Sequence, residues 1–149
     1  MTAISKNAIV PYSAAQMFDL VNAVEDYPQF LPWCVGSEVL LRNDDEVKAT
    51  LVLGQGGMQK SFTTCNRLQQ DKMIQIRLID GPFRQLEGYW RFENLPTHLC
   101  KVSLDLEFEF SNKLMAIAFS KVFNQVANTL VDAFCNRAAA LYGPQRIAG

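Results

Sequence analysis

The sequence lacks the residue groupings that metal sites and many enzyme active sites require. Its only histidine is His98, and its four cysteines (Cys34, Cys65, Cys100 and Cys135) form no CxxC pair. Zinc sites need several such ligands at short spacing, and a nucleophilic triad would have to take its base from His98, which falls in a predicted turn. We therefore expect no metal site and no catalytic residues. We interpret the cysteines as reduced, buried small side chains.

The sequence also has no cluster of charges of one sign. Fourteen Lys and Arg residues oppose fifteen Asp and Glu residues, and the basic residues are scattered from Lys6 to Arg146. Because nucleic acids and anionic membranes attract concentrated basic patches, we expect no DNA partner. The glycine-rich "GQGG" at 54–57 lacks the lysine and the following helix of a phosphate loop, so it predicts a hairpin turn.

Long uninterrupted apolar runs are missing as well. The most apolar late stretch, "LMAIAFSKVFNQVANTLVDAF", contains several polar residues, including Lys121 and Asp132, which argues against a membrane span. The opening "MTAISKNAIV" has none of the features of a signal peptide. We expect a cytoplasmic protein with at most a peripheral contact at the inner membrane.

The patterns that are present predict strands, a short helix and a meander. Residues 3–10 predict a strand, and the following stretch predicts a helix in which Ser13 and Gln16 have the spacing of a capping box. From Val35 to Phe110, apolar and polar residues alternate between turn signals at 43–45, 54–57, 69–72, 80–82 and 94–98. This pattern indicates an antiparallel meander with one apolar face.

The C-terminal part predicts a long helix that covers this face. Residues 112–142 contain neither proline nor glycine and end before Gly143 and Pro144. Thirty helical residues span about 45 Å. The apolar stripe comprises Met115, Phe119, Val122, Phe123, Val126, Leu130, Phe134, Ala138 and Leu141. We predict one α+β domain over residues 1–149, in which a curved antiparallel sheet grips the long helix.

The segment "YPQFLPWC", residues 27–34, follows neither the helical nor the strand period. Its prolines restrict regular helix to a single turn, which we expect to start at Asp26. We interpret Phe30 and Leu31 as a structural plug at one end of the interior. Tyr27 and Trp33 have apolar bodies and polar tips, which suits the gate of a cavity.

Gly88 leaves a side chain out of the apolar face between Leu86 and Trp90. This gap is compatible with a bend in a filled core or with the wall of a cavity. Ligand cavities begin near 300 Å³, and an open apolar cavity of that size would cost on the order of 7 kcal/mol. We therefore expect such a cavity to be filled by a ligand or partly collapsed.

Three stretches resemble the coenzyme-Q-binding START-like family of the polyketide cyclase/dehydrase and lipid transport superfamily. They are "YPQFLPWC" (27–34), "GPFRQLEGYWRF" (81–92) and "FNQVANTLVDAFCNRAAALYG" (123–143). The resemblance implies a helix-grip fold with a cavity that accepts lipids such as ubiquinone. The candidate cavity or gate residues are Tyr27, Pro28, Phe30, Leu31, Trp33, Phe83, Leu86, Gly88, Trp90, Phe92, Phe119, Phe123, Val126 and Leu130.

Three functions follow as hypotheses. The first is a non-enzymatic protein that holds a polyprenyl quinone or similar lipid and supports respiration, with no required cofactor. The second, also implied by the resemblance, is a ribosome association toxin that binds the large ribosomal subunit and blocks subunit association. The third is a cyclase, which would need acid and base groups at inward positions that are almost wholly apolar.

Overall fold

The computed structural model describes residues 2–143 and contains a seven-stranded antiparallel sheet with the strand order β1-β7-β6-β5-β4-β3-β2. The elements in chain order are β1 (Thr2–Val10), α1 (Ala14–Asn22), the 3-10 helix η1 (Val24–Gln29), β2 (Cys34–Arg42), β3 (Glu46–Gln55), β4 (Met58–Gln69), β5 (Met73–Asp80), β6 (Phe83–Leu95), the 3-10 helix η2 (Pro96–His98), β7 (Leu99–Phe110) and α2 (Lys113–Tyr142).

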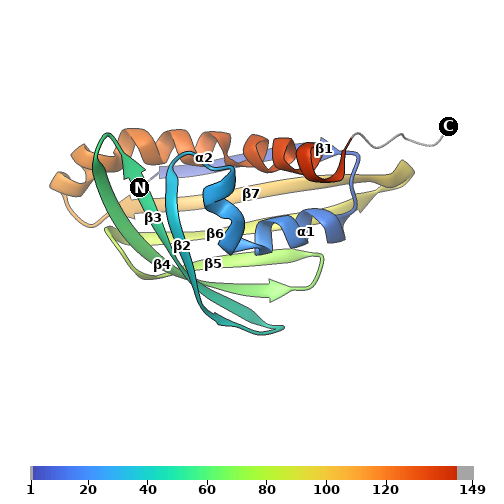
Figure 1. Cartoon of the computed structure of the whole chain (residues 1–149), viewed down its shortest axis with the longest axis horizontal. Coiled ribbons are helices and arrows are strands. Elements are labelled where there is room, and N and C mark those ends of the chain that lie inside the picture. Colours follow the sequence, from blue (N-terminus) through green and yellow to red (C-terminus); the bar gives the residue numbers. More distant parts are fainter. Residues whose placement is uncertain (1, 144–149) are drawn as a thin grey trace.

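The sheet curves around α2, which confirms the predicted α+β helix-grip fold (Figure 1). Helix α2 lies along the concave side, where it contacts β1 and β7, while α1 packs on β5, β6, β7 and α2, and η1 packs on β2. Register shifts in β2 and between β6 and β7 mark local irregularities in pairing, and such bulges bend a sheet.

Local sequence signals set the element boundaries. The Ser13 side chain accepts a hydrogen bond from the backbone of Gln16, and the Gln16 side chain accepts one from the backbone of Ser13, so the predicted capping box is formed. Gly56 and Gly57 both have positive φ and join β3 to β4 as the predicted hairpin turn. The Asn112 side chain caps α2 at its N-terminus, and the helix ends at Gly143 with a φ of 71°.

The helical turn predicted to start at Asp26 is longer than expected. It begins at Val24 and runs to Gln29, with Pro28 inside it. Pro28 is the fifth of its six residues, and the 3-10 conformation accommodates it because proline fixes φ near the helical value. The segment therefore continues almost directly from α1 into β2.

The core lies between the concave sheet face and the helices, as the alternation predicted. One prediction for α2 is wrong: Leu141 is 53% exposed, whereas Ala127 and Val131, which the predicted stripe omits, are buried. The last turn of α2 is held instead by Tyr142, whose hydroxyl donates to the Gln16 carbonyl. By length and composition α2 could cross a membrane, but in this structure one of its faces packs on the sheet and α1.

Candidate functional site

A cavity of about 80 Å³ lies between α2, the concave sheet face and the α1–η1 segment. It is mostly apolar, and its lining consists of Val21, Val24, Tyr27, Trp33, Leu51, Phe62, Thr64, Asn66, Ile76, Leu86, Trp90, Leu106, Phe123, Val126 and Leu130. Its volume is below the roughly 300 Å³ of typical ligand sites. A void of this size costs about 2 kcal/mol, which fits the partly collapsed state expected from the sequence.

Two aromatic clusters contribute to the cavity wall. In the first, the ring centroids of Tyr27 and Trp90 each lie 5.3 Å from that of Phe134. In the second, Phe123 lies 4.6 Å from Phe108 and 6.3 Å from Phe62. Rings at these separations pack favourably, so these walls are stiff and only a few side chains remain free to move.

Half of the fourteen candidate residues line this cavity: Tyr27, Trp33, Leu86, Trp90, Phe123, Val126 and Leu130. The others lie elsewhere. Leu31, Phe83, Phe92 and Phe119 are buried in the surrounding core, and Phe30 is half-buried against it. Pro28 is exposed on η1.

Gly88 does not line the cavity, and its missing side chain has a different reason. A Cβ at this position would lie 2.6 Å from the backbone oxygen of Asp105 and 2.9 Å from Leu106 Cδ1. The close approach of β7 therefore excludes any side chain here. Of the two sequence interpretations, the structure favours a packed core.

Two polar lining residues were missed by the sequence reasoning. Thr64 and Asn66 are buried on the concave face of β4. The period-two pattern Phe62, Thr64, Asn66, Leu68 places both on the apolar side of this strand. That pattern could have identified them as polar residues in the interior.

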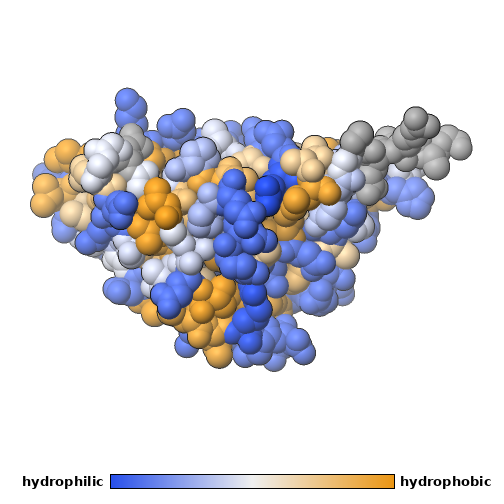
Figure 2. Space-filling view, viewed as in Figure 1, coloured by the Kyte–Doolittle hydropathy of each residue, from blue (hydrophilic) through white to orange (hydrophobic). Residues whose placement is uncertain are grey.

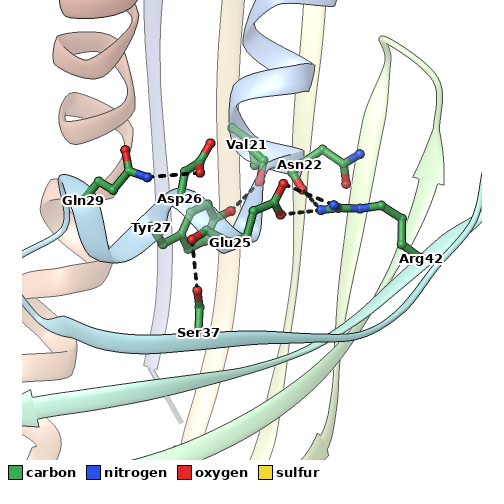
Figure 3. A network of polar contacts seen from close by, with 8 residues as sticks. All are labelled: Val21, Asn22, Glu25, Asp26, Tyr27, Gln29, Ser37 and Arg42. Carbon is green, nitrogen blue, oxygen red and sulfur yellow. Dashed lines mark hydrogen bonds and ion pairs between the residues drawn. The ribbon is translucent and has the colours of Figure 1, made fainter.

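Figure 3 shows the polar contacts that join η1 to the end of α1 and to β2. The Arg42 guanidinium donates to both carboxylate oxygens of Glu25, at 3.2 and 2.6 Å, and to the Asn22 carbonyl at 3.0 Å. These hydrogen bonds lower the pKa of Glu25. The Tyr27 hydroxyl donates to the Val21 carbonyl inside the protein, so η1 is fastened both at its surface and from within.

The cavity wall has little capacity for acid–base chemistry. Within residues 2–143, its only titratable lining group is Tyr27, and burial raises the pKa of that phenol far above its ordinary value. His98 is exposed in η2. The four cysteines are free, and burial raises the pKa of each thiol, which disfavours the reactive thiolate. No group of three or more His, Cys, Asp or Glu residues suited to a metal occurs within the described residues.

The fold brings together basic residues that are scattered in the sequence. Lys48 pairs with Cys65 across β3 and β4, and Cys65 pairs with Arg77 on β5, so the two cations share the outer face. Arg67 lies on the same face of β4, two residues from Cys65. The carboxylates Glu46 and Glu87 are the register partners of Arg67 and Arg77. The outer face therefore has a small patch with three cations and two anions.

A family model described as "Polyketide cyclase / dehydrase and lipid transport" matches residues 10–135. The Ribosome association toxin RatA of Escherichia coli (strain K12) is 44% identical over 95% of this chain and 90% of that protein. RatA of Vibrio cholerae serotype O1 (strain ATCC 39541 / Classical Ogawa 395 / O395) is 46% identical over 96% of this chain and 99% of that protein. The mitochondrial Coenzyme Q-binding protein COQ10 of Dictyostelium discoideum is 28% identical over 89% of this chain and 66% of that protein.

Solved structures with a similar fold are also found. The 18 kDa protein CC1736 from Caulobacter crescentus is 30% identical with a TM-score of 0.74, covering 97% of this chain and 100% of that one. The Zhui aromatase/cyclase from Streptomyces sp. R1128 is 16% identical with a TM-score of 0.71, covering 97% of this chain and 99% of that one. The second likeness concerns the fold alone.

Proposed function

Because the chain belongs to the polyketide cyclase / dehydrase and lipid transport family, we propose that it acts by binding and that its principal target is the ribosome. The observation that carries this proposal is the 44% identity to RatA of E. coli along 95% of the chain. The name of that relative, Ribosome association toxin, supports the ribosome as the target. We propose, as the family resemblance implies, that the protein binds the large subunit and blocks subunit association. No cofactor and no chemical step are required.

The geometry supports placing this role ahead of lipid binding, the reverse of the order suggested by the sequence. A cavity of about 80 Å³ is too small for a quinone ring and its tail without rearrangement. On the outer face, the proposal rests on three cations that lie beside Glu46 and Glu87. Lys48, Arg67 and Arg77 form no ion pair within residues 2–143, so their charges are available to phosphates of ribosomal RNA.

A sedimentation experiment with two matched double variants tests the proposal. The variant Arg67→Glu/Arg77→Glu should reduce cosedimentation with purified large subunits by at least tenfold, because two phosphate contacts become repulsive. Lys113→Glu/Lys121→Glu makes the same change in net charge on exposed residues of α2, and it should bind like the wild type. If the wild-type protein stays at the top of the gradient at low salt, the ribosomal function is wrong. If only the α2 variant loses binding, the surface that contacts the ribosome lies on that helix and not on the outer face of the sheet.

Binding of a quinone or similar lipid is a second candidate function. It is favoured by the apolar cavity with two buried polar residues at its wall, and the relative named Coenzyme Q-binding protein supports it. Entry requires movement of the half-buried lining side chains Trp33, Ile76 and Leu130. Lipid extraction and mass spectrometry of protein purified without detergent should recover an isoprenoid or acyl lipid. Finding neither in stoichiometric amount would count against this function.

The cyclase hypothesis gains no support from the site. Such an enzyme would need acid and base groups against its substrate, whereas the described cavity wall offers only the Tyr27 phenol, and that phenol donates to the Val21 carbonyl. For both binding functions we propose a cytoplasmic location, with at most a peripheral membrane contact during lipid exchange.

A further inference from the structure

Thr64 and Asn66 are unusual neighbours for an apolar cavity. Thr64 is 6% exposed and Asn66 is 9% exposed. Thr64 pairs with Ala49 on one side of β4 and Leu78 on the other. Asn66 pairs in the same way with Val47 and Ile76. The two side chains therefore form a polar island, the Thr64–Asn66 pair, on an otherwise apolar part of the sheet.

The hydrogen bonding of this pair is incomplete. The Thr64 hydroxyl donates to Asn66 Oδ1 at 3.2 Å. The amide nitrogen of Asn66 carries two N–H groups, whereas the side-chain hydrogen bond that Asn66 makes within residues 2–143 is accepted by its oxygen. The fully buried side-chain atoms without a hydrogen-bond partner in the described residues are Asn22 Oδ1 and Arg137 Nε. The Asn66 amide nitrogen is not one of them, so it keeps some exposure, and the residue lines the cavity. A donor without a protein partner can therefore be reached by a ligand in the cavity.

We propose that Asn66 donates a hydrogen bond to a carbonyl oxygen of an uncharged lipid bound in the cavity, and that Thr64 is a positioning residue for this contact. The proposal rests on the second candidate function, lipid binding, and specifies the head group. Because Oδ1 already accepts from Thr64, the end of the amide left for a ligand is the donor end. The ligand atom is therefore an acceptor.

The rest of the wall determines the other properties of the ligand. No charged side chain lines the cavity within the described residues, so an ionised head group would lose its hydration without gaining a counter-charge. The remaining lining is aliphatic or aromatic, which suits a ring or chain of carbon atoms. A quinone and an acyl ester both present a carbonyl on an apolar body, and that shared chemistry is what the site selects.

Calorimetric titration with two probes tests the inference. The polar probe is 2,3-dimethoxy-5-methyl-6-decyl-1,4-benzoquinone, and decylbenzene is its counterpart without oxygen. Asn66→Leu should weaken quinone binding roughly tenfold, the value of one hydrogen bond of about 1.4 kcal/mol, and should change decylbenzene binding less than twofold. Thr64→Val frees the Asn66 amide to rotate and should weaken quinone binding several-fold. A methyl-oleate titration should give the same ranking if an acyl carbonyl is equally accepted, and no binding if the site reads the quinone alone.

A matched control lies one residue away. Thr63 faces the opposite side of β4, where its hydroxyl shares a hydrogen bond of 2.8 Å with Thr50. Thr63→Val makes the same substitution on the same strand without touching the cavity, and it should leave both titrations unchanged. Thr64→Val leaves Asn66 Oδ1 without its donor and should lower the melting temperature slightly. The double variant Thr64→Val/Asn66→Leu removes both partners from an apolar site and should keep or raise it.

Each other outcome has a defined meaning. Equal weakening of both probes, together with a lower melting temperature, would make the Thr64–Asn66 pair structural and overturn the inference while lipid binding stands. Unchanged quinone binding in both variants would overturn it in the same way. If neither quinone, methyl oleate nor decylbenzene binds the wild-type protein, the lipid function itself is wrong and the inference falls with it.

Discussion

The two tryptophans of the cavity wall differ in exposure, and we expect one to stabilise the core and the other to control entry to the cavity. Both line the cavity, but Trp90 is 2% exposed and contacts Phe134, whereas Trp33 is half-buried next to β2. Removing a buried aromatic ring leaves a cavity that the surrounding side chains fill only in part. A partly exposed one can move without unfolding the protein, so Trp33 is the better candidate for a gate.

Alanine substitutions test this division. Trp90→Ala should cost about 3–5 kcal/mol of the free energy of unfolding, the usual penalty for removing a buried aromatic ring. Trp33→Ala should cost less than half of that and should weaken lipid retention more than it lowers stability. Urea unfolding and lipid mass spectrometry measure the two effects. Equal losses of stability in the two variants would show that Trp33 is a structural core residue and not a gate.

Between elements, side-chain contacts at the surface attach η1 to β2, and we expect them to influence access to the cavity. The Arg42–Glu25 contact joins the two, and Ser37 on β2 donates to the Glu25 carbonyl at 3.4 Å. Glu25 and Arg42 are about two-fifths to one-half exposed, and exposed ion pairs contribute at most about 1 kcal/mol. The surface contact therefore contributes little to the stability of the fold, and the buried Tyr27 hydroxyl holds η1 from within.

The variant Arg42→Met removes this attachment and has a defined pH dependence. Since the contact lowers the pKa of Glu25, its stabilisation is present above the ordinary glutamate pKa and is lost as the pH falls through the lower pKa of the folded state. Arg42→Met should thus be less stable than the wild type by up to about 1 kcal/mol at pH 7, and the difference should vanish in acid. Urea unfolding at both pH values measures it.

A comparable pair elsewhere serves as the control for η1. Arg91 and Asp105 form an ion pair of 2.9 Å on the outer face, with exposures of 54% and 45%. Arg91→Met should lower stability by a similar amount at pH 7. Only Arg42→Met should speed the binding of the decyl-benzoquinone probe. Equal rates in the two variants would show that η1 does not gate the cavity.

At the scale of elements, local patterns were sufficient for most of the fold. The alternation in β7 and the Gly56–Gly57 turn predict strands and hairpins because both depend on neighbours in the chain. The start of η1 was misplaced because a proline limits helix without fixing its first residue.

At the scale of the whole molecule, properties that depend on several strands were missed. The closeness of Lys48, Arg67 and Arg77 follows from the register of three strands, which composition does not reveal. Gly88 was partly misread because the atom that excludes its side chain, the Asp105 oxygen, belongs to another strand. Seven of the fourteen candidate residues line the cavity. A periodic pattern identifies which side chains point inward, but it does not show where the interior leaves a cavity.

At the scale of the whole molecule, the two proposed sites lie on opposite faces of the sheet, with the large partner outside and the small ligand inside. Arg67 and Arg77 are on one side of the sheet, and Thr64 and Asn66 are on the other. Variants on the two faces should therefore be independent, as expected for sites without shared contacts. Thr64→Val/Asn66→Leu should leave ribosome binding unchanged.

The most direct test of the proposed ribosomal function measures subunit association. Purified small and large ribosomal subunits are mixed with the protein under conditions that favour the joined ribosome and are separated on a sucrose gradient. We predict that the joined-ribosome peak falls as protein is added, and that the protein sediments with the large subunit. A joined-ribosome peak that is unchanged at saturating protein, with the protein left at the top of the gradient, would contradict the account.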